Sequence, residues 1–337
     1  MRIGLIAPPW LPIPPPKYGG TEAVIDRLAQ GLAAAGHEVL LFTTGDATCP
    51  VQRASVLEVA AMARLGQSVV EQRHVIHAYK ALADCDVVHD HTTIGPLYAN
   101  RYPGLPVLTT NHGPFNVELR DVYREIACRA GVIAVSHHQA STAEDVPIAG
   151  VIHHGIDVQE YQPGEGEGGY VLFLGRMAPD KGARRAVLAA RDAGVPLKLA
   201  AKMREPLEIE YFTDQVRPLL GDGIEYVGEI GGVDKAALLS GARALINPIR
   251  WPEPFGLVMI EALACGTPVL AFPEGAAPEI VEHGVTGWLC DDAADLATAI
   301  GRIPTLDRSK CRAAVSARFS TERMVNAHLE LYARVAR

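Results

Sequence analysis

The sequence has little of what marks several common protein classes. Its six cysteines are widely scattered and form no CxxC pair, which argues against a disulfide framework or zinc site and indicates a reducing compartment. Lys and Arg number 31 against 39 Asp and Glu, so the net charge of -8 disfavours nucleic acid or a strongly anionic membrane as partner. No apolar run approaches the roughly 18 residues that a membrane-spanning helix needs.

The first residues contain one basic residue and a short apolar stretch that runs into prolines, which is not the pattern of a secretory signal. Aromatic residues make up only 6%, whereas hydrophobic residues make up 48%, and 32 Gly and 24 Pro punctuate the chain. This composition is typical of a folded, aliphatic protein rather than a disordered or collagen-like one. We therefore expect a cytoplasmic protein without a transmembrane segment.

Short aliphatic runs alternate with helix-period segments along nearly the whole chain, which predicts α/β architecture with parallel sheets buried on both faces. The length of 337 residues suits two domains at roughly 100–200 residues each. The predicted strands lie at residues 2–7, 38–43, 87–91, 107–111, 132–135, 151–153, 170–174, 197–200, 224–227, 244–247, 268–271 and 287–289. The clearest predicted helices lie at residues 21–35, 208–216, 234–242, 255–265 and 321–335.

Two doubly wound, Rossmann-like domains follow from this alternation. We place the first at 1–158, a Gly- and Glu-rich linker at 159–169, the second at 170–320 and a last helix at 321–337. Ligands of open parallel sheets bind outside the carboxyl ends of the strands, so we expect the two domains to face each other across a ligand-binding cleft.

The most specific motif contains two glutamates around a predicted strand-to-helix junction, in Glu253-Pro254-Phe255-Gly256-Leu257 followed by Glu261. If Pro254 and Phe255 open the helix, the backbone N–H groups of Phe255, Gly256 and Leu257 are first-turn donors that suit a phosphate. The helix macrodipole favours an acid at the helix start and explains Glu253 without function. It does not explain Glu261, which lies among apolar residues of the same helix.

A second motif, Gly175-Arg176-Met177-Ala178-Pro179-Asp180-Lys181-Gly182, follows the first predicted strand of the second domain. Arg176 offers a planar fork and Lys181 a point charge, and together they suit a diphosphate. No Ser or Thr follows the lysine, so the motif is not a Walker A loop. Read alone, it is also compatible with a glycine-bounded turn carrying solvated charges.

Two motifs of the first domain also follow predicted strands. Gly19 and Gly20 open a predicted helix, where bare backbone suits a phosphate or a sugar, although paired glycines also form simple turns. His112 ends another strand and would lie beside the proposed cleft. An isolated histidine is often structural, but this position favours a functional role.

Two apparent metal motifs are better explained without a metal. In His89-Asp90-His91, strand alternation sends the two histidines to one face and the aspartate to the other, which favours packing or acceptor contact. Asp84-Cys85-Asp86 fits the DxD pattern by which some enzymes hold a metal ion, but it precedes its strand and so lies at the wrong end of the sheet. We expect no metal site.

Taken in order, these motifs resemble those of a family 4 retaining glycosyltransferase of the GT-B fold. The resemblance rests on Gly19-Gly20, His112, Gly175-Arg176 with Lys181-Gly182, and the motif from Glu253 to Glu261, and it covers essentially the whole chain. It implies an acceptor-binding first domain, a second domain that binds a nucleotide sugar, and a last helix that crosses back to the first domain.

The resemblance also implies a role for each residue. Arg176 and Lys181 would neutralise the diphosphate, helped by the amides of Phe255, Gly256 and Leu257. Glu253 would bind donor sugar hydroxyls, Glu261 the ribose hydroxyls, and His112 would orient or stabilise the reacting sugar. Gly19 and Gly20 would contact the donor, and Lys202 is a further candidate contact. No metal or other cofactor would be needed.

Other functions stay open at this point. A phosphorylase of similar architecture requires a Schiff-base lysine for pyridoxal phosphate, and a nucleotide-sugar-binding subunit could keep every motif without turnover. A dinucleotide oxidoreductase is disfavoured because no GxGxxG follows the first strand of either domain. His154 stands where the resembled family more often has Asn, and the donor base, the sugar and the acceptor remain open. The negative charge favours a soluble hydroxyl acceptor over a membrane-bound one.

Overall fold

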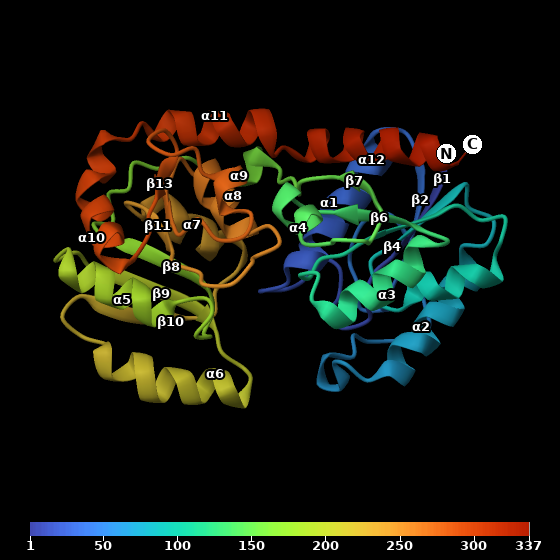
Figure 1. Cartoon of the computed structure of the whole chain (residues 1–337), viewed down its shortest axis with the longest axis horizontal. Coiled ribbons are helices and arrows are strands. Elements are labelled where there is room, and N and C mark those ends of the chain that lie inside the picture. The colour runs from blue at the N-terminus through green and yellow to red at the C-terminus, as the bar shows by residue number, and fades with distance from the viewer. Residues whose placement is uncertain (337) are drawn as a thin grey trace. The chain divides into compact units, whose positions relative to one another are not determined.

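The computed structural model of the protein describes residues 1–336, which form two compact α/β units. The first unit contains Met1–Gly155 and the C-terminal segment from Thr321, and the second contains Ile156–Ser320. Each unit is built on one parallel sheet with helices around it (Figure 1). The predicted fold class is confirmed.

The first unit has a seven-stranded sheet in the order β3-β2-β1-β4-β5-β6-β7. Its strands are β1 Arg2–Ile6, β2 Glu38–Thr43, β3 Gln52–Ser55, β4 Val87–Asp90, β5 Val107–Thr110, β6 Gly131–Ala134 and β7 Ile148–Val151. Its helices are α1 Gly20–Ala34, α2 Ser68–Ala81, α3 Val117–Ala127, α4 His137–Ser141 and α12 Thr321–Val335, with 3-10 turns at Met62–Arg64 and Gly95–Arg101. The strand order reverses between β1 and β4, and loops that follow these strands supply site residues of this unit.

The second unit has a six-stranded sheet in the order β10-β9-β8-β11-β12-β13. Its strands are β8 Val171–Arg176, β9 Leu197–Lys202, β10 Ile224–Gly228, β11 Leu245–Asn247, β12 Val269–Ala271 and β13 Gly287–Leu289. Its helices are α5 Ala183–Asp192, α6 Pro206–Tyr211, α7 Gly232–Gly241, α8 Leu257–Ala264, α9 Ala277–Ile280, α10 Ala293–Arg302 and α11 Arg308–Arg318. A π-helical turn, Phe212–Val216, continues α6, and 3-10 turns lie at Val158–Glu160, Arg217–Leu219 and Ile303–Thr305.

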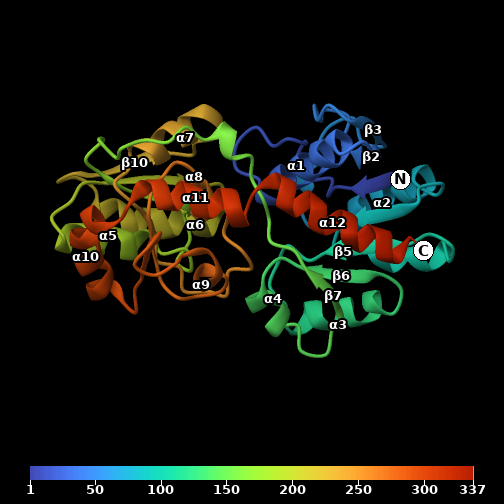
Figure 2. The same ribbon diagram turned by 90° about the horizontal axis from the view of Figure 1, so that it is seen from above.

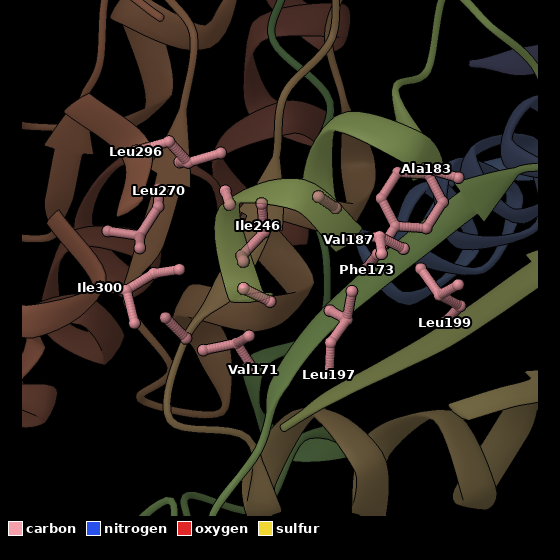
Figure 3. Close-up of a cluster of buried hydrophobic side chains, with 14 of the residues drawn as sticks. Val171, Phe173, Ala183, Val187, Leu197, Leu199, Ile246, Leu270, Leu296 and Ile300 are labelled. Carbon is pink, nitrogen blue, oxygen red and sulfur yellow. The ribbon is translucent and has the colours of Figure 1, made fainter. Parts of the chain in front are cut away.

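The apolar runs that predict the strands bury both faces of each sheet. In the second unit, Phe173 of β8 and Leu199 of β9 pack with Val187 of α5 in one core cluster (Figure 3). Ile246 and Leu270 extend this core through β11 and β12. The apolar face of α5 therefore packs on the sheet. This packing places the amino-terminal end of α5, which Lys181 precedes, at the carboxyl end of β8.

The last helix returns to the first unit, as predicted. Helix α12 lies beside α1 in both views (Figures 1 and 2). The contact is close, because a Cβ added to Gly31 of α1 would lie 2.5 Å from Val325 Cγ2 of α12. The hydroxyl of Tyr332 also reaches His89 of β4 at 2.8 Å, so α12 covers buried polar groups of the sheet.

Three local features differ from the sequence-based prediction. Strand β3 carries the polar sequence Gln-Arg-Ala-Ser at the sheet edge, so no apolar run marks it. Strand β7 is Ile148–Val151 rather than 151–153, because it pairs with β6 through Ile148, Gly150 and Val151. Residues 159–169, predicted as a linker, lie within the second unit, where the N–H groups of Gly164 and Gly168 donate to Cys265 and Gly241.

Within residues 1–336, no helix combines the length and the apolar character that crossing a membrane requires.

Candidate active site

The loop after β8 holds Arg176 and Lys181 in place. Arg176 is the last residue of β8, and the N–H of Met177 donates to the carbonyl of Lys202 at 2.9 Å. Gly182 caps the start of α5 with a φ of 87°, and a Cβ there would lie 2.4 Å from the carbonyl oxygen of Pro248. A glycine is needed for both reasons, and this tight turn presents Lys181 beside the loop that contains Pro248.

That neighbouring loop, between β11 and α8, carries Glu253 and is bonded to the Lys181 loop. The N–H of Arg250 donates to the carbonyl of Asp180 at 2.9 Å. The Arg185 guanidinium of α5 donates to the carbonyls of Pro248 and Asp180 at 2.8 and 2.9 Å. The partly buried Arg185 guanidinium thus joins two segments that lie about 70 residues apart in sequence, and the two predicted motifs form one site.

Within this site, Lys181 forms an ion pair with Glu253 through Oε2. Trp251 Nε1 donates to the same oxygen at 2.5 Å, and Lys181 Nζ lies 5.2 Å from the centre of the Trp251 ring. The side chains of Lys181 and Glu253 are only 11% and 19% exposed. In residues 1–336, Glu253 Oε1 accepts no hydrogen bond, so one carboxylate oxygen is held and the other is available to a ligand.

The backbone of Glu253 is fixed by the loop after β12. The N–H of Ala276 donates to the Glu253 carbonyl at 3.0 Å. The neighbouring Gly275 has a φ of 58°, and a Cβ there would lie 2.3 Å from Glu253 O and 2.5 Å from Glu253 N. Sequence reasoning assigned no role to Gly275, although its place in the loop after a parallel strand was a usable signal.

Helix α8 begins at Leu257, two residues later than predicted. Gly256 is its N-cap, with a φ of 100° that only glycine adopts readily. Phe255 therefore precedes the helix, and its ring packs edge-on against Phe319 with centroids 5.9 Å apart. The first-turn amides that lack intrahelical acceptors begin at Leu257, which corrects the expectation that Phe255 and Gly256 lie inside the helix.

Glu261 of α8 is the second buried glutamate, with 4% exposure. Its Oε1 accepts from Lys235 Nζ of α7 at 2.7 Å and from the Tyr161 hydroxyl at 3.0 Å. Across the described part of the chain, its Oε2 accepts no hydrogen bond. Glu253 and Glu261 thus share one arrangement, in which two donors fix one carboxylate oxygen and the other accepts no hydrogen bond from the described residues. Sequence reasoning missed Lys235, which lies on another helix.

Arg176 and Lys202 both face Glu208 of α6. Arg176 NH1 lies 3.6 Å and Lys202 Nζ 3.9 Å from Glu208 Oε1, and Arg176 also lies 3.6 Å from Asp180. Glu208 is 3% exposed, and its other oxygen accepts from the Arg204 N–H at 2.8 Å. A buried carboxylate therefore orients two cations at the carboxyl ends of β8 and β9. Only a capping-box pattern at the start of α6 marks Glu208 in the sequence.

In the first unit, His112 follows β5 and contacts two other histidines. Its Nε2 lies 2.9 Å from His91 Nδ1, and its ring is nearly parallel to that of His154, with centroids 5.4 Å apart. Burial, together with the nearby His328, lowers the pKa of His112 to about 4. His112 is therefore neutral at pH 7, and it can act on a ligand as a hydrogen-bonding group but not as a cation.

The residues of His89-Asp90-His91 have separate partners. His89 contacts the Tyr332 hydroxyl through Nδ1 and the Thr110 hydroxyl through Nε2, both at 2.8 Å. Asp90 lies on the other face, where it accepts from the Tyr79 hydroxyl at 3.0 Å, and burial raises its pKa to about 7. This alternation agrees with the strand geometry read from the sequence.

Gly19 and Gly20 lie at the start of α1, after the loop that follows β1. Gly19 is the N-cap in an extended conformation, and a Cβ there would lie 2.7 Å from Pro15 Cβ. The same Cβ would lie 3.1 Å from Oε2 of Glu22, a buried carboxyl whose pKa is raised by burial. The acid beside Gly19 suits a ligand hydroxyl better than a phosphate. No hydrogen bond within residues 1–336 joins Gly19 or Gly20 to His112.

Family models match both halves of the chain. A model described as Glycosyltransferase Family 4 matches residues 18–160, and one described as Glycosyl transferases group 1 matches residues 168–305. The chain belongs to glycosyltransferase family 4. The predicted resemblance to glycosyltransferase family 4 is thereby confirmed, and the two matched segments lie largely within the two motif-bearing units.

Named relatives of this family 4 glycosyltransferase include enzymes of Mycolicibacterium smegmatis. Its phosphatidyl-myo-inositol mannosyltransferase is 27% identical over 95% of this chain and 88% of its own length. Its D-inositol 3-phosphate glycosyltransferase is 30% identical over 55% of this chain and 47% of its own length. The two names contain different compounds, phosphatidyl-myo-inositol and D-inositol 3-phosphate. Similarity to these relatives therefore does not identify the acceptor of this chain.

Solved structures similar to the chain are GT-B glycosyltransferases. AviGT4, a glycosyltransferase involved in avilamycin A biosynthesis, matches with a TM-score of 0.76 and 27% identity over 99% of this chain and 98% of that one. Anabaena HepE, solved with UDP and glucose, matches with a TM-score of 0.79 and 21% identity over 99% of both chains. The likeness to HepE concerns the fold.

Proposed function

We propose that the protein is a retaining glycosyltransferase that moves a hexose from a nucleoside diphosphate sugar to a hydroxyl acceptor without a metal ion. The observation that carries the proposal is the cluster of Lys181, Glu253 and the glycine-capped start of α8 in the second unit. A cation, a half-satisfied carboxylate and unpaired helix amides together match a diphosphate joined to a sugar.

The charges of the second unit suit the leaving group. Negative charge builds on the diphosphate as the glycosidic bond breaks, and Lys181, Arg176 and the amides from Leu257 onward would stabilise it. These fixed positive groups take the part that a divalent metal plays elsewhere, which is why we propose a metal-independent reaction. Lys181 already pairs with Glu253, so a bound phosphate would share or replace that partner.

The two glutamates suit hydroxyl recognition rather than acid–base chemistry. Glu253 is held by its ion pair with Lys181 and by the Trp251 indole N–H, both of which bond to Oε2. Its Oε1 would accept from a donor sugar hydroxyl, and Oε2 of Glu261 from a ribose hydroxyl. The acceptor hydroxyl would attack from the face of the leaving group and pass its proton to a donor phosphate oxygen.

The first unit would bind the acceptor, with neutral His112 placed beside the transferred sugar. Glu22, next to Gly19 and Gly20, would orient a hydroxyl there. We propose a cytoplasmic enzyme with a soluble acceptor, supported by the overall charge of -8, which disfavours an anionic membrane surface. The donor base and the sugar are left to experiment.

The test is a turnover assay with UDP-, GDP- and ADP-linked glucose and mannose in the presence of EDTA. We expect release of a nucleoside diphosphate from one of these donors, and loss of at least 100-fold of that rate in Glu253→Gln and in Lys181→Met. Glu282→Gln, on an exposed turn of the same unit, is the matched control and should keep the rate.

A second candidate function is a nucleotide-sugar-binding subunit without catalysis, which the same cluster would also serve. Binding of a donor without turnover, with hydroxyl acceptors supplied, favours that candidate. Full turnover in both the Glu253 and the Lys181 variant contradicts the site assignment, and turnover abolished by EDTA contradicts the metal-independent mechanism. The anomeric configuration of the product, read by proton NMR, decides whether the reaction retains configuration.

A further inference from the structure

His91 and His112 form a direct pair at the carboxyl edge of the first sheet. They follow the adjacent parallel strands β4 and β5, and His91 Nδ1 lies 2.9 Å from His112 Nε2. The backbone of His91 is anchored, since its N–H donates to the Ile6 carbonyl of β1 at 2.9 Å. His91 is 5% exposed, whereas His112 is partly open to solvent.

The pair holds one proton between its two nitrogens. Burial and the adjacent histidines keep the pKa of His91 well below its usual range, and burial lowers that of His112 to about 4. The rings of His89 and His154 pack against the pair, His328 packs against His89, and no carboxylate of residues 1–336 bonds to either imidazole. At neutral pH both rings are neutral, so one nitrogen donates and the other accepts.

The surroundings of His91 Nε2, the nitrogen outside the pair, indicate whether His91 or His112 is the donor. His91 Nε2 is buried and has no hydrogen-bond partner among the described residues. If His112 donated, His91 would carry its proton on Nε2 and bury an orphaned N–H. If His91 donates through Nδ1, only a lone pair is left unpaired, and buried unpaired acceptors are tolerated better than buried unpaired donors.

His74 supplies an internal comparison. It is fully buried, and its Nε2 donates to the carbonyl of Ala7 at 2.9 Å, because a carbonyl can only accept. Its Nδ1 is buried without a partner, so there the unpaired atom is a lone pair. The same unit therefore already contains a neutral histidine with an unpaired acceptor nitrogen.

We propose that His91 is a positioning residue for His112, donating its Nδ1–H to His112 Nε2 and holding the His112 ring as the tautomer that is protonated on Nδ1. His112 then presents a fixed Nδ1–H donor, and within residues 1–336 this nitrogen makes no other hydrogen bond. The ligand of this N–H rests on the proposed function, in which it would donate a hydrogen bond to an oxygen of the transferred sugar. A ring that is free to flip would hold the donor in place less well.

A second layer of contacts supports the His91 ring. The ring of His89 lies 4.0 Å from that of His91, centroid to centroid. His89 is itself fixed at both nitrogens, by Tyr332 of α12 and Thr110 of β5. The return of α12 to the first unit thus holds the ring that backs His91.

The direct test is nitrogen-15 NMR of the histidine side chains at pH 7, with the His91 signals assigned from the variants below and the His112 signals from His112→Asn. We expect both rings to be neutral and protonated on Nδ1, and His112 Nε2 to have the shift of an unprotonated acceptor. A protonated His112 Nε2, or an imidazolium at either position, overturns the proposal. This experiment needs no substrate, so it stands even if no nucleotide sugar is turned over.

The functional test compares His91→Asn with His91→Phe. The Asn amide can donate from nearly the place of Nδ1, whereas Phe fills the site without a donor. We expect His91→Asn to keep His112 protonated on Nδ1 and kcat within about threefold, and His91→Phe to lose that tautomer and at least tenfold in kcat with little change in the donor KM.

His77→Phe, an exposed histidine of α2, controls for loss of a histidine and should match the wild type. Equal kcat in His91→Phe and the wild type, or an equal fall in both His91 variants with the tautomer kept, overturns the positioning role. If His91→Phe does not fold, the tautomer of the wild type and the kcat of His91→Asn still decide the matter.

Discussion

Replacement of Gly275 by alanine tests how the site holds Glu253. Gly275 is buried and has a φ of 58°, and an added Cβ would lie 2.3 Å from Glu253 O and 2.5 Å from Glu253 N. These atoms are backbone, so they cannot swing aside as the end of a side chain can. The Glu253 loop must move, and its ion pair with Lys181 must move with it.

Gly194 provides a matched control in the same unit. It has a φ of 66°, but it is exposed and an added Cβ would meet nothing within 4 Å. Gly194→Ala therefore carries the left-handed strain of about 1–2 kcal/mol, partly offset by about 0.4–1 kcal/mol from the stiffer unfolded chain. Gly275→Ala adds an overpacking cost of about 1–3 kcal/mol.

We expect Gly194→Ala to lower the free energy of unfolding by at most about 1.6 kcal/mol, and Gly275→Ala to lower it by about 1–3 kcal/mol more than that. Urea unfolding followed by tryptophan fluorescence measures both, because Trp251 and Trp288 lie in this unit. We also expect Gly275→Ala, but not Gly194→Ala, to lower donor turnover by at least tenfold, since a displacement of about 1 Å at a site can cost a factor near 100. Equal stability and equal turnover in the two variants would show that Gly275 does not hold the Glu253 loop in place.

Two further predictions concern the buried polar groups. Lys235→Met should weaken nucleoside diphosphate binding by about tenfold, because it removes a charged hydrogen-bond donor from Glu261, and Tyr161→Phe should weaken it less. Calorimetry measures both affinities. Unchanged affinity in Lys235→Met would count against the role of Glu261. In the folded protein the pKa values of His74, His112 and His328 are lowered to about 4, so the unfolded chain binds more protons than the folded one between pH 6.5 and 4. The free energy of unfolding should therefore fall by about 1–2 kcal/mol for each of these histidines from pH 7 to pH 5. Asp90, with a pKa raised to about 7, stabilises the fold as the pH is lowered, but it is one group against three histidines. The midpoints of urea unfolding at pH 7 and pH 5 measure the net effect, and a higher midpoint at pH 5 would contradict the prediction.

The apolar runs made most of the fold predictable. Both sheets are parallel and covered on two faces, so their strands read as near-continuous aliphatic segments, and the last helix matches its predicted start and end at Thr321–Val335. Strand β3 was not predicted, because an exposed edge strand needs no apolar residues. The start of α8 was misjudged because Gly256 caps the helix from a left-handed conformation, which sequence periodicity does not reveal.

The site was predictable where a motif is local and unpredictable where partners come from elsewhere. Lys181 and Glu253 were each marked by glycine-bearing loops, but their ion pair depends on the way in which Arg185 joins the two loops. Lys235 lies on a helix without a motif, and the capping-box pattern of Glu208 says nothing of a site, so their roles follow only from the tertiary contacts with Glu261 and Arg176.

Titration calorimetry with nucleoside diphosphates in EDTA tests whether Lys181 belongs to a diphosphate site in the second unit. We expect one equivalent of the preferred diphosphate to bind the wild type and Lys310→Met, which alters an exposed lysine of α11. Lys181→Met should bind it about 10- to 100-fold more weakly, as expected for loss of a charge-assisted hydrogen bond of about 1.5–3 kcal/mol. Equal affinity in all three proteins would contradict the role of Lys181 in the diphosphate site, and binding that EDTA abolishes would contradict a metal-independent site.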